Sequence, residues 1–138
     1  MLNIFFSIIS YDIWFYLSHV LLHSKSLYKF HKEHHKKIYP KFLDTYTGHF
    51  LEGPFQGLGM LLPFLYFNYN IYDILIVLSF LNIRGMMRHD IRFAFLIGNH
   101  HLLHHRYPKY NFGEYWLDYM FGTKYPNNED YQNGLIYL

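Results

Sequence analysis

Two long apolar runs divide the chain, and neither contains a lysine or an arginine. The first covers residues 1–23 and the second covers residues 54–83. As a helix, the first run would be about 33 Å long at roughly 1.5 Å per residue, which is enough to cross the hydrocarbon core of a bilayer. It lacks the positive N-terminal region of a cleaved signal peptide, so we expect it to be retained. We therefore predict a transmembrane helix over residues 1–23.

The second apolar run is interrupted near its middle. Pro63 and the polar residues Asn68 and Asn70 favour a turn there. We predict a helical hairpin over residues 54–83. Each arm would be roughly 21 Å long, so the hairpin is expected to dip into the membrane rather than cross it fully. The chain would then return to the side from which it entered.

The basic residues flank these runs. All 12 lysines and arginines lie between residues 25 and 41 or from residue 84 onward. By the positive-inside rule, residues 24–53 and 84–123 should face the cytoplasm. We predict an integral, multi-pass protein of the endoplasmic reticulum membrane in a eukaryote, or of the cytoplasmic membrane otherwise. The tail after Thr123 has the composition of irregular structure.

Composition supports a membrane location and excludes several function classes. Of the 138 residues, 51% are hydrophobic and 16% are charged, whereas soluble domains average roughly 25% charged residues. The length predicts a single domain, residues 1–138. The chain has no cysteine, which rules out thiolate metal sites, iron–sulfur clusters and cysteine nucleophiles. A net charge of +2 without a long basic run argues against nucleic-acid binding.

The 11 histidines are clustered rather than scattered. Three clusters contain His19 and His23; His31, His34 and His35; and His101, His104 and His105. The last two share the pattern H-x-x-H-H. On an α-helix, positions i, i+3 and i+4 lie on one face, so each triplet would present its imidazoles together. Neutral imidazoles that converge in this way bind transition metals. We predict that all eight are metal ligands.

Eight ligands are too many for one ion, because a single metal rarely takes more than about six protein groups. The economical interpretation is two adjacent ions, with one H-x-x-H-H triplet contributing mainly to each. Imidazole suits zinc, copper, iron and nickel alike, so ligand type alone does not name the metal.

Asp12 and Tyr16 lie on the same predicted helix face as His19 and His23. An acidic residue within a membrane span is costly and therefore a functional candidate. We expect Tyr16 to support the ligands on this face, and we expect Asp12 either to accept a hydrogen bond that orients an imidazole or to form an interhelical hydrogen bond.

Three histidines lie outside the clusters. His89 follows the hairpin on the cytoplasmic side and is predicted to be a ninth ligand. His49, with Glu52 three residues later, is expected to form a turn at a helix start or to support a ligand. His100 would point away from the face that carries His101.

These motifs, in this order, resemble the fatty acid hydroxylase/sterol desaturase superfamily of integral membrane diiron oxygenases. The likeness comprises D-x-x-x-Y-x-x-H-x-x-x-H over residues 12–23, HKEHH over 31–35, HLLHH over 101–105 and NFGEYWLDYMFGT over 111–123. The resemblance implies an all-α membrane bundle with a cytoplasmic, histidine-rich helical cap that holds the dinuclear site. It also implies that His89 is a ligand and that Asn111 and Asp118 support the ligands.

The resemblance further implies two iron ions that use O2 to hydroxylate or desaturate a sterol, fatty acyl or sphingolipid chain. Zinc would be a possible substitute in a purified protein. A lipid would enter laterally beside the aromatic-rich residues 64–72. The sequence has no haem or flavin motif, so electrons are expected from an external b-type cytochrome or reductase that docks on the basic cytoplasmic face.

Two other classes stay open. One is a zinc-dependent membrane enzyme such as a hydrolase, although H-E-x-x-H does not occur. The other is a non-catalytic or truncated homologue that binds metal.

Overall fold

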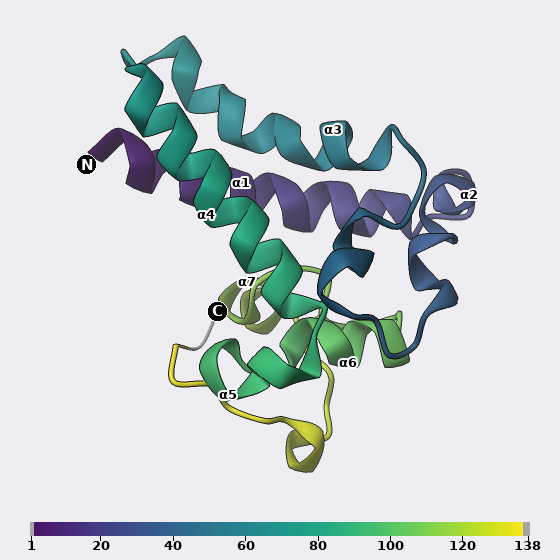
Figure 1. The fold of residues 1–138 in the computed structure, drawn as a ribbon. Coiled ribbons are helices and arrows are strands. Elements are labelled where there is room, and N and C mark those ends of the chain that lie inside the picture. Colours follow the sequence, from purple (N-terminus) through teal and green to yellow (C-terminus); the bar gives the residue numbers. More distant parts are fainter. Residues whose placement is uncertain (1, 137–138) are drawn as a thin grey trace.

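Helices and the loops between them make up residues 2–136, the part of the chain that the computed structural model describes (Figure 1). No strand occurs in this range, so the predicted all-α class is confirmed. Residue 1 and residues 137–138, the ends of the predicted domain, lie outside the described residues.

The N-terminal helix α1 spans Leu2–Leu22. Within residues 2–136 it alone is long and apolar enough to cross a membrane. Large apolar side chains on its outer face are exposed, for example Phe5 at 58% and Leu21 at 49%. Its buried positions are instead mainly polar, and they include Ser7, Asp12 and His19.

The second apolar run folds into two antiparallel arms beside α1. The first arm consists of α3 (Glu52–Gly57) and the 3-10 helix η3 (Leu58–Leu65), and the second arm is α4 (Ile71–Arg88). A capping box at the start of α4, in which Asn70 accepts from the Asp73 N–H at 2.9 Å, restarts the helix after the turn. Helix α4 continues past residue 83, the predicted end of the hairpin.

The first arm packs closely against α1. Trp14 donates its indole N–H to the Phe55 carbonyl and Ser10 donates to the Gly59 carbonyl, both at 2.7 Å. A Cβ at position 59 would lie 2.4 Å from the Trp14 Cβ, so only glycine allows this approach.

Shorter elements gather around the C-terminal ends of α1 and α4 (Figure 1). They are α2 (Tyr28–His31), η1 (His34–Lys36), η2 (Phe42–Tyr46), η4 (Ile91–Phe93), α5 (Ala94–Ile97), α6 (His100–Arg106), α7 (Tyr115–Met120) and η5 (Asn128–Asp130). HKEHH is therefore not one α-helix, because His31 ends α2 while His34 and His35 begin a 3-10 turn.

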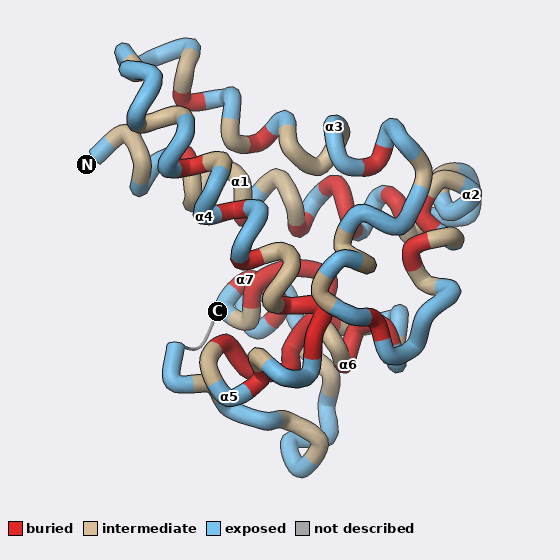
Figure 2. The backbone as a smooth tube through the Cα atoms, viewed as in Figure 1, coloured by how far each residue is buried: buried red, intermediate tan, exposed pale blue. Residues whose placement is uncertain are grey.

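Buried residues concentrate around α6, α7 and the end of α4, whereas the outer faces of α1, η3 and α4 are largely exposed (Figure 2). Most of the buried residues are polar or charged, and the exposed ones include many large apolar side chains. This distribution is the reverse of that in a water-soluble domain.

Candidate metal centre

The structure brings the nine predicted ligand histidines together in two groups. Within each group, the candidate ligand atoms lie within 4.8 Å of one another. The first group, here the α1 group, contains His19, His23, His31, His35 and His104; the second, the α4 group, contains His34, His89, His101 and His105.

The sequence predicts that each H-x-x-H-H motif contributes mainly to one ion, and in the structure each motif places two of its three histidines in one group and the third in the other. In both motifs the histidines at i and i+4 enter the same group and the one at i+3 enters the other. In α6, His101 and His105 lie close to the same helical angle, whereas His104 lies on the other flank. Each motif therefore bridges the two groups and holds them next to each other.

Hydrogen bonds at Nδ1 fix the orientation of six of these rings. The Nδ1 acceptors are the carbonyl oxygens of Phe112 for His19 (2.5 Å), Thr47 for His34 (2.9 Å), Gly85 for His89 (2.7 Å), Tyr110 for His104 (2.6 Å) and Lys37 for His105 (3.2 Å), and Glu52 Oε1 for His31 (2.8 Å). A carbonyl oxygen only accepts, so Nδ1 carries the proton in those five rings. Their Nε2 atoms carry no proton, so each has a lone pair that is free to bind a metal ion.

These lone pairs face one another. His34 and His89 both use Nδ1 as a donor, yet their Nε2 atoms lie 3.0 Å apart. Two lone pairs at this distance do not form a hydrogen bond. In addition, the buried Nε2 of His105 has no hydrogen-bond partner among the described residues.

A metal ion would resolve this arrangement. Adjacent ligands of an octahedral ion with metal–nitrogen bonds of about 2.1 Å lie roughly 3.0 Å apart. Nε2 of His31 lies 2.9 Å from Nε2 of His19 and 2.9 Å from Nε2 of His35, and the His89–His101 Nε2 distance is 3.2 Å. The residues present therefore fit one transition-metal ion in each group.

Burial keeps these imidazoles neutral at pH 7, which is the form that binds metal. Burial, with a smaller contribution from neighbouring imidazoles, lowers the pKa of His23 to about 4 and those of His35 and His89 to about 3. The same cause lowers the pKa of the other ligand candidates outside α1, namely His31, His34, His101, His104 and His105.

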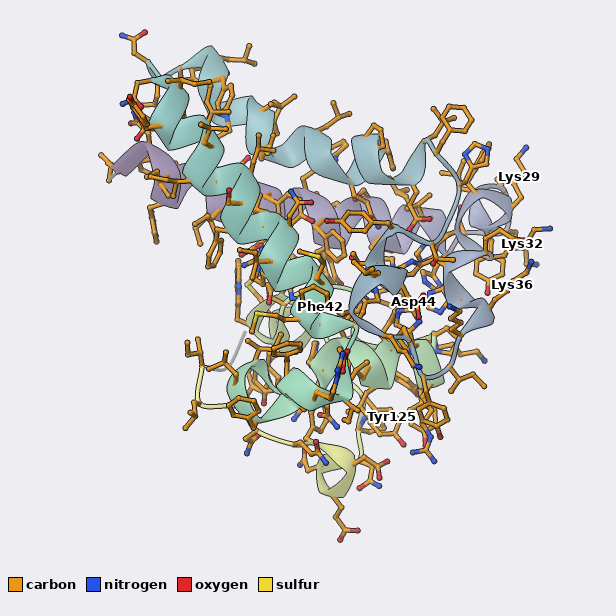
Figure 3. The ribbon with its side chains drawn as sticks, in the orientation of Figure 1. Lys29, Lys32, Lys36, Phe42, Asp44 and Tyr125 are labelled. Atoms are coloured by element: carbon orange, nitrogen blue, oxygen red, sulfur yellow. The ribbon has the colours of Figure 1, made fainter. Side chains whose placement is uncertain are left out.

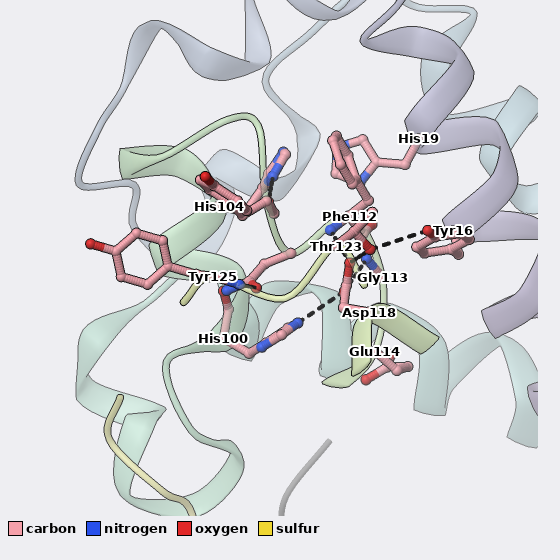
Figure 4. Close-up of polar contacts among 12 residues, drawn as sticks. Tyr16, His19, His100, His104, Phe112, Gly113, Glu114, Asp118, Thr123 and Tyr125 are labelled. Carbon is pink, nitrogen blue, oxygen red and sulfur yellow. Dashed lines mark hydrogen bonds and ion pairs between the residues drawn. The ribbon is translucent and has the colours of Figure 1, made fainter. Parts of the chain in front are cut away.

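Asp118 organises the loop that reaches two of the rings. Its carboxylate accepts from the Phe112 and Gly113 N–H groups, both at 2.8 Å, and from the Thr123 hydroxyl at 2.7 Å. It also contacts His100 Nε2 at 3.0 Å (Figure 4). The loop in turn presents the Phe112 carbonyl to His19. Asp118 thus supports the α1 group without touching a ligand candidate in it.

Tyr16 and Asn111 hold the same loop. The Tyr16 hydroxyl lies 3.1 Å from the Thr123 hydroxyl (Figure 4). Asn111 adopts a left-handed φ of 58° and donates to the His100 carbonyl at 3.0 Å. His100 itself belongs to neither histidine group.

Asp12 and His49 lie elsewhere. The Asp12 carboxylate pairs with Arg84 of α4, and its described contacts include no imidazole. This is the interhelical alternative rather than the imidazole-orienting one. His49 accepts from the Leu51 N–H at 3.3 Å in the turn before α3 and is outside both groups.

Sequence reasoning did not assign roles to Glu52, Arg84, Arg88 or Glu114. All four are buried; Arg84 pairs with Asp12, and Arg88 pairs with Glu114. Glu52 and Arg84 lie within two residues of the ends of the second apolar run. A charged residue at the edge of an apolar run is the sequence feature that could have marked Glu52 and Arg84 as candidates.

A small cavity of about 60 Å³ adjoins the histidines and is lined by Tyr11, Phe15, Arg84, Arg88 and five of the ligand candidates, among other residues. The aromatic segment 64–72 does not line it. Tyr66 and Phe67 line a separate groove between α1 and η3. The predicted lipid access beside residues 64–72 thus leads to a cavity that shares no lining residue with the histidine site.

The fold and the site place the chain among helical proteins with paired all-histidine groups. The fatty acid hydroxylase family matches residues 4–123, and the chain belongs to this family. The predicted membership of the fatty acid hydroxylase/sterol desaturase superfamily is confirmed.

A curated relative is the Delta(7)-sterol 5(6)-desaturase of Eremothecium gossypii. It is 29% identical over 123 residues, which cover 83% of this chain and 34% of the relative. The chain therefore spans about a third of the length of this relative. No solved structure matches the chain significantly.

Proposed function

We propose that this chain is a membrane-bound diiron oxygenase that hydroxylates or desaturates a lipid with O2 and external electrons. The observation that carries the proposal is the pair of adjacent all-histidine groups whose Nε2 lone pairs face one another. The family membership and the similarity to a sterol desaturase support a lipid substrate, such as a sterol, a fatty acyl chain or a sphingolipid.

The α1 group would hold one iron and the α4 group the other. When bound, the two irons supply the redox chemistry needed to oxidise an unactivated C–H bond, which no side chain provides. Zinc has no redox chemistry and would give an inactive protein. The backbone carbonyls and Glu52 hold the Nδ1 protons in place, so every ring in these contacts keeps its Nε2 directed at the centre.

The chain would sit in a membrane through α1 and the arms of the hairpin over residues 54–83. Their exposed apolar side chains, such as Ile13, Leu62 and Ile76, support this placement because water would make such a surface unfavourable. The histidine groups would then lie at the cytoplasmic end of α1.

Electrons would arrive at the basic surface near the histidines. Lys29, Lys32 and Lys36 extend outward from the segment of α2 and η1 (Figure 3). This surface fits an acidic b-type cytochrome or reductase, since complementary charge favours encounter.

Lipid extracts of cells that express the chain would test the proposal. We expect an oxidised lipid that requires O2 and is lost in His34→Ala and His104→Ala but retained in the control His49→Ala. Under ¹⁸O2, hydroxylation places ¹⁸O in the lipid, whereas desaturation does not. Undiminished product in both ligand variants would exclude the proposed site, and no product from the iron-loaded wild type would favour a non-catalytic homologue.

A further inference from the structure

The small cavity beside the histidines adjoins a wider one between α3 and α4. The wider cavity has a volume of about 280 Å³. Both cavities are lined by the same five residues, Tyr11, Thr45, Gln56, Leu81 and Gly85. These five residues therefore lie between the α3–α4 cleft and the histidine groups, and we call them the neck.

The neck is unusually polar for a path into an apolar helical region. Tyr11, Thr45 and Gln56 are half-buried there, and their side chains make no hydrogen bond to any other described residue. A ligand that displaces water from these half-buried groups must replace their hydrogen bonds, so a ligand that pairs with them binds more favourably than one that does not. A wholly apolar chain would leave all three unpaired.

The wider cavity is mixed in character. Met60, Leu78 and Leu81 supply apolar surface, while Tyr46 and Asn82 already bond each other at 3.0 Å. Small-molecule sites usually measure at least about 300 Å³, so this cavity holds only one end of a lipid. The remainder of the lipid would lie outside the cleft.

We propose that the cleft admits a lipid alcohol by its polar end and that Tyr11, Thr45 and Gln56 bind the hydroxyl group at the neck. The phenol, the threonine hydroxyl and the amide each donate and accept hydrogen bonds, so together they match the donor and the acceptor of a hydroxyl. A carbon within a few bonds of that hydroxyl would then face the histidines. The choice of this carbon rests on the proposed function, but the binding does not.

Lipid binding to the purified full chain in the absence of O2 tests the proposal, because binding is then measured without turnover of the lipid. The probes are a tritiated sterol and its 3-deoxy analogue, and a long-chain alcohol and the corresponding alkane. The two pairs distinguish a ring alcohol from a chain alcohol. We expect at least one alcohol to bind about 10-fold more tightly than its deoxy partner, as expected for a hydrogen bond worth about 1.4 kcal/mol.

Three variants locate the effect. Gln56→Leu and Thr45→Val should each remove most of the preference for the alcohol and leave deoxy-lipid binding within about twofold, whereas the matched control Gln132→Leu should change neither. Gly85→Leu should close the neck and abolish binding of both lipids, because a Cβ at this position already lies 3.4 Å from Thr45 Oγ1.

Equal affinity for both alcohols and their deoxy partners would overturn the proposal, as would an unchanged preference in Gln56→Leu and Thr45→Val. Unchanged lipid binding in Gly85→Leu would overturn the route. A preference for an alcohol without any oxidation would refute the proposed function alone. Oxidation without such a preference would refute the present inference alone.

Discussion

Nδ1 of His31 lies 2.8 Å from Oε1 of Glu52, and both side chains are buried. The contact links α2 to the first turn of α3, so it joins a ligand candidate of the α1 group to the hairpin. A carboxyl that orients a ligating imidazole tunes both its direction and its basicity.

Glu52→Leu should weaken metal binding in the α1 group by about 10- to 100-fold, because the His31 ring loses its acceptor. Glu52→Gln should retain more affinity, since its amide oxygen still accepts. Chelator competition would measure both variants against the control Glu33→Gln, whose partner is the exposed Lys36. Wild-type affinity in Glu52→Leu would show that the pair does not support the site.

The histidine pattern was readable from the sequence because its ligands repeat at short spacings. Positions 31–35 and 101–105 carry the same motif, and local geometry alone brings their imidazoles close together. His100 was separated from the ligand candidates by its helix face and His49 by the turn expected before Glu52, and the structure places both outside the two groups.

The sequence did not predict which histidines share a group. This division depends on His34 meeting His89 across 55 positions and on His23 meeting His104 across 81 positions. Such long-range contacts are set by how α1, α4 and α6 pack. The Asp12–Arg84 pair similarly depends on the extension of α4 past residue 83.

Asp118→Ala should destabilise the protein by about 3 kcal/mol or more, because buried donors at Phe112, Gly113 and Thr123 would lose their acceptor. Thermal unfolding in detergent would measure this loss. The half-buried Asp73→Ala, which removes only one contact of the capping box at the start of α4, should cost about 1 kcal/mol. Equal effects of the two substitutions would contradict the structural role of Asp118.

Arg84→Met should be more damaging than the double variant Asp12→Leu with Arg84→Met. Breaking one side of a buried ion pair leaves an unpaired charge and costs about 3–5 kcal/mol, whereas removing both charges avoids that penalty. Unfolding free energies of the two single variants, the double variant and the wild type form the required cycle. Additive single effects would indicate that Asp12 and Arg84 act independently.

The metal-free protein should lose stability as the pH falls from 7 to 5. Unfolded histidines bind protons near their ordinary pKa of 6.5, whereas burial holds the pKa of His23 at about 4 and of His89 at about 3 in the folded state. The unfolded state then binds more protons, so stability rises with pH by up to about 1.4 kcal/mol per pH unit for each such histidine.

Glu52 acts in the opposite direction, because burial raises its pKa from 4.5 to about 8. Glu52 is a single group, whereas several histidines have lowered pKa values, so the imidazoles determine the direction in which stability changes with pH. Unfolding midpoints of the metal-free chain at pH 5, 6 and 7 would check the slope. A midpoint that is constant or higher at pH 5 would contradict it.

The number of irons per chain tests the central claim most directly. After anaerobic reconstitution with Fe²⁺, elemental analysis should give two irons for the wild type and for His49→Ala, in line with the two histidine groups. His104→Ala should lose iron from the α1 group and His34→Ala from the α4 group, so each should retain no more than one. A wild-type ratio of one or less, or two irons in both ligand variants, would contradict a dinuclear histidine centre.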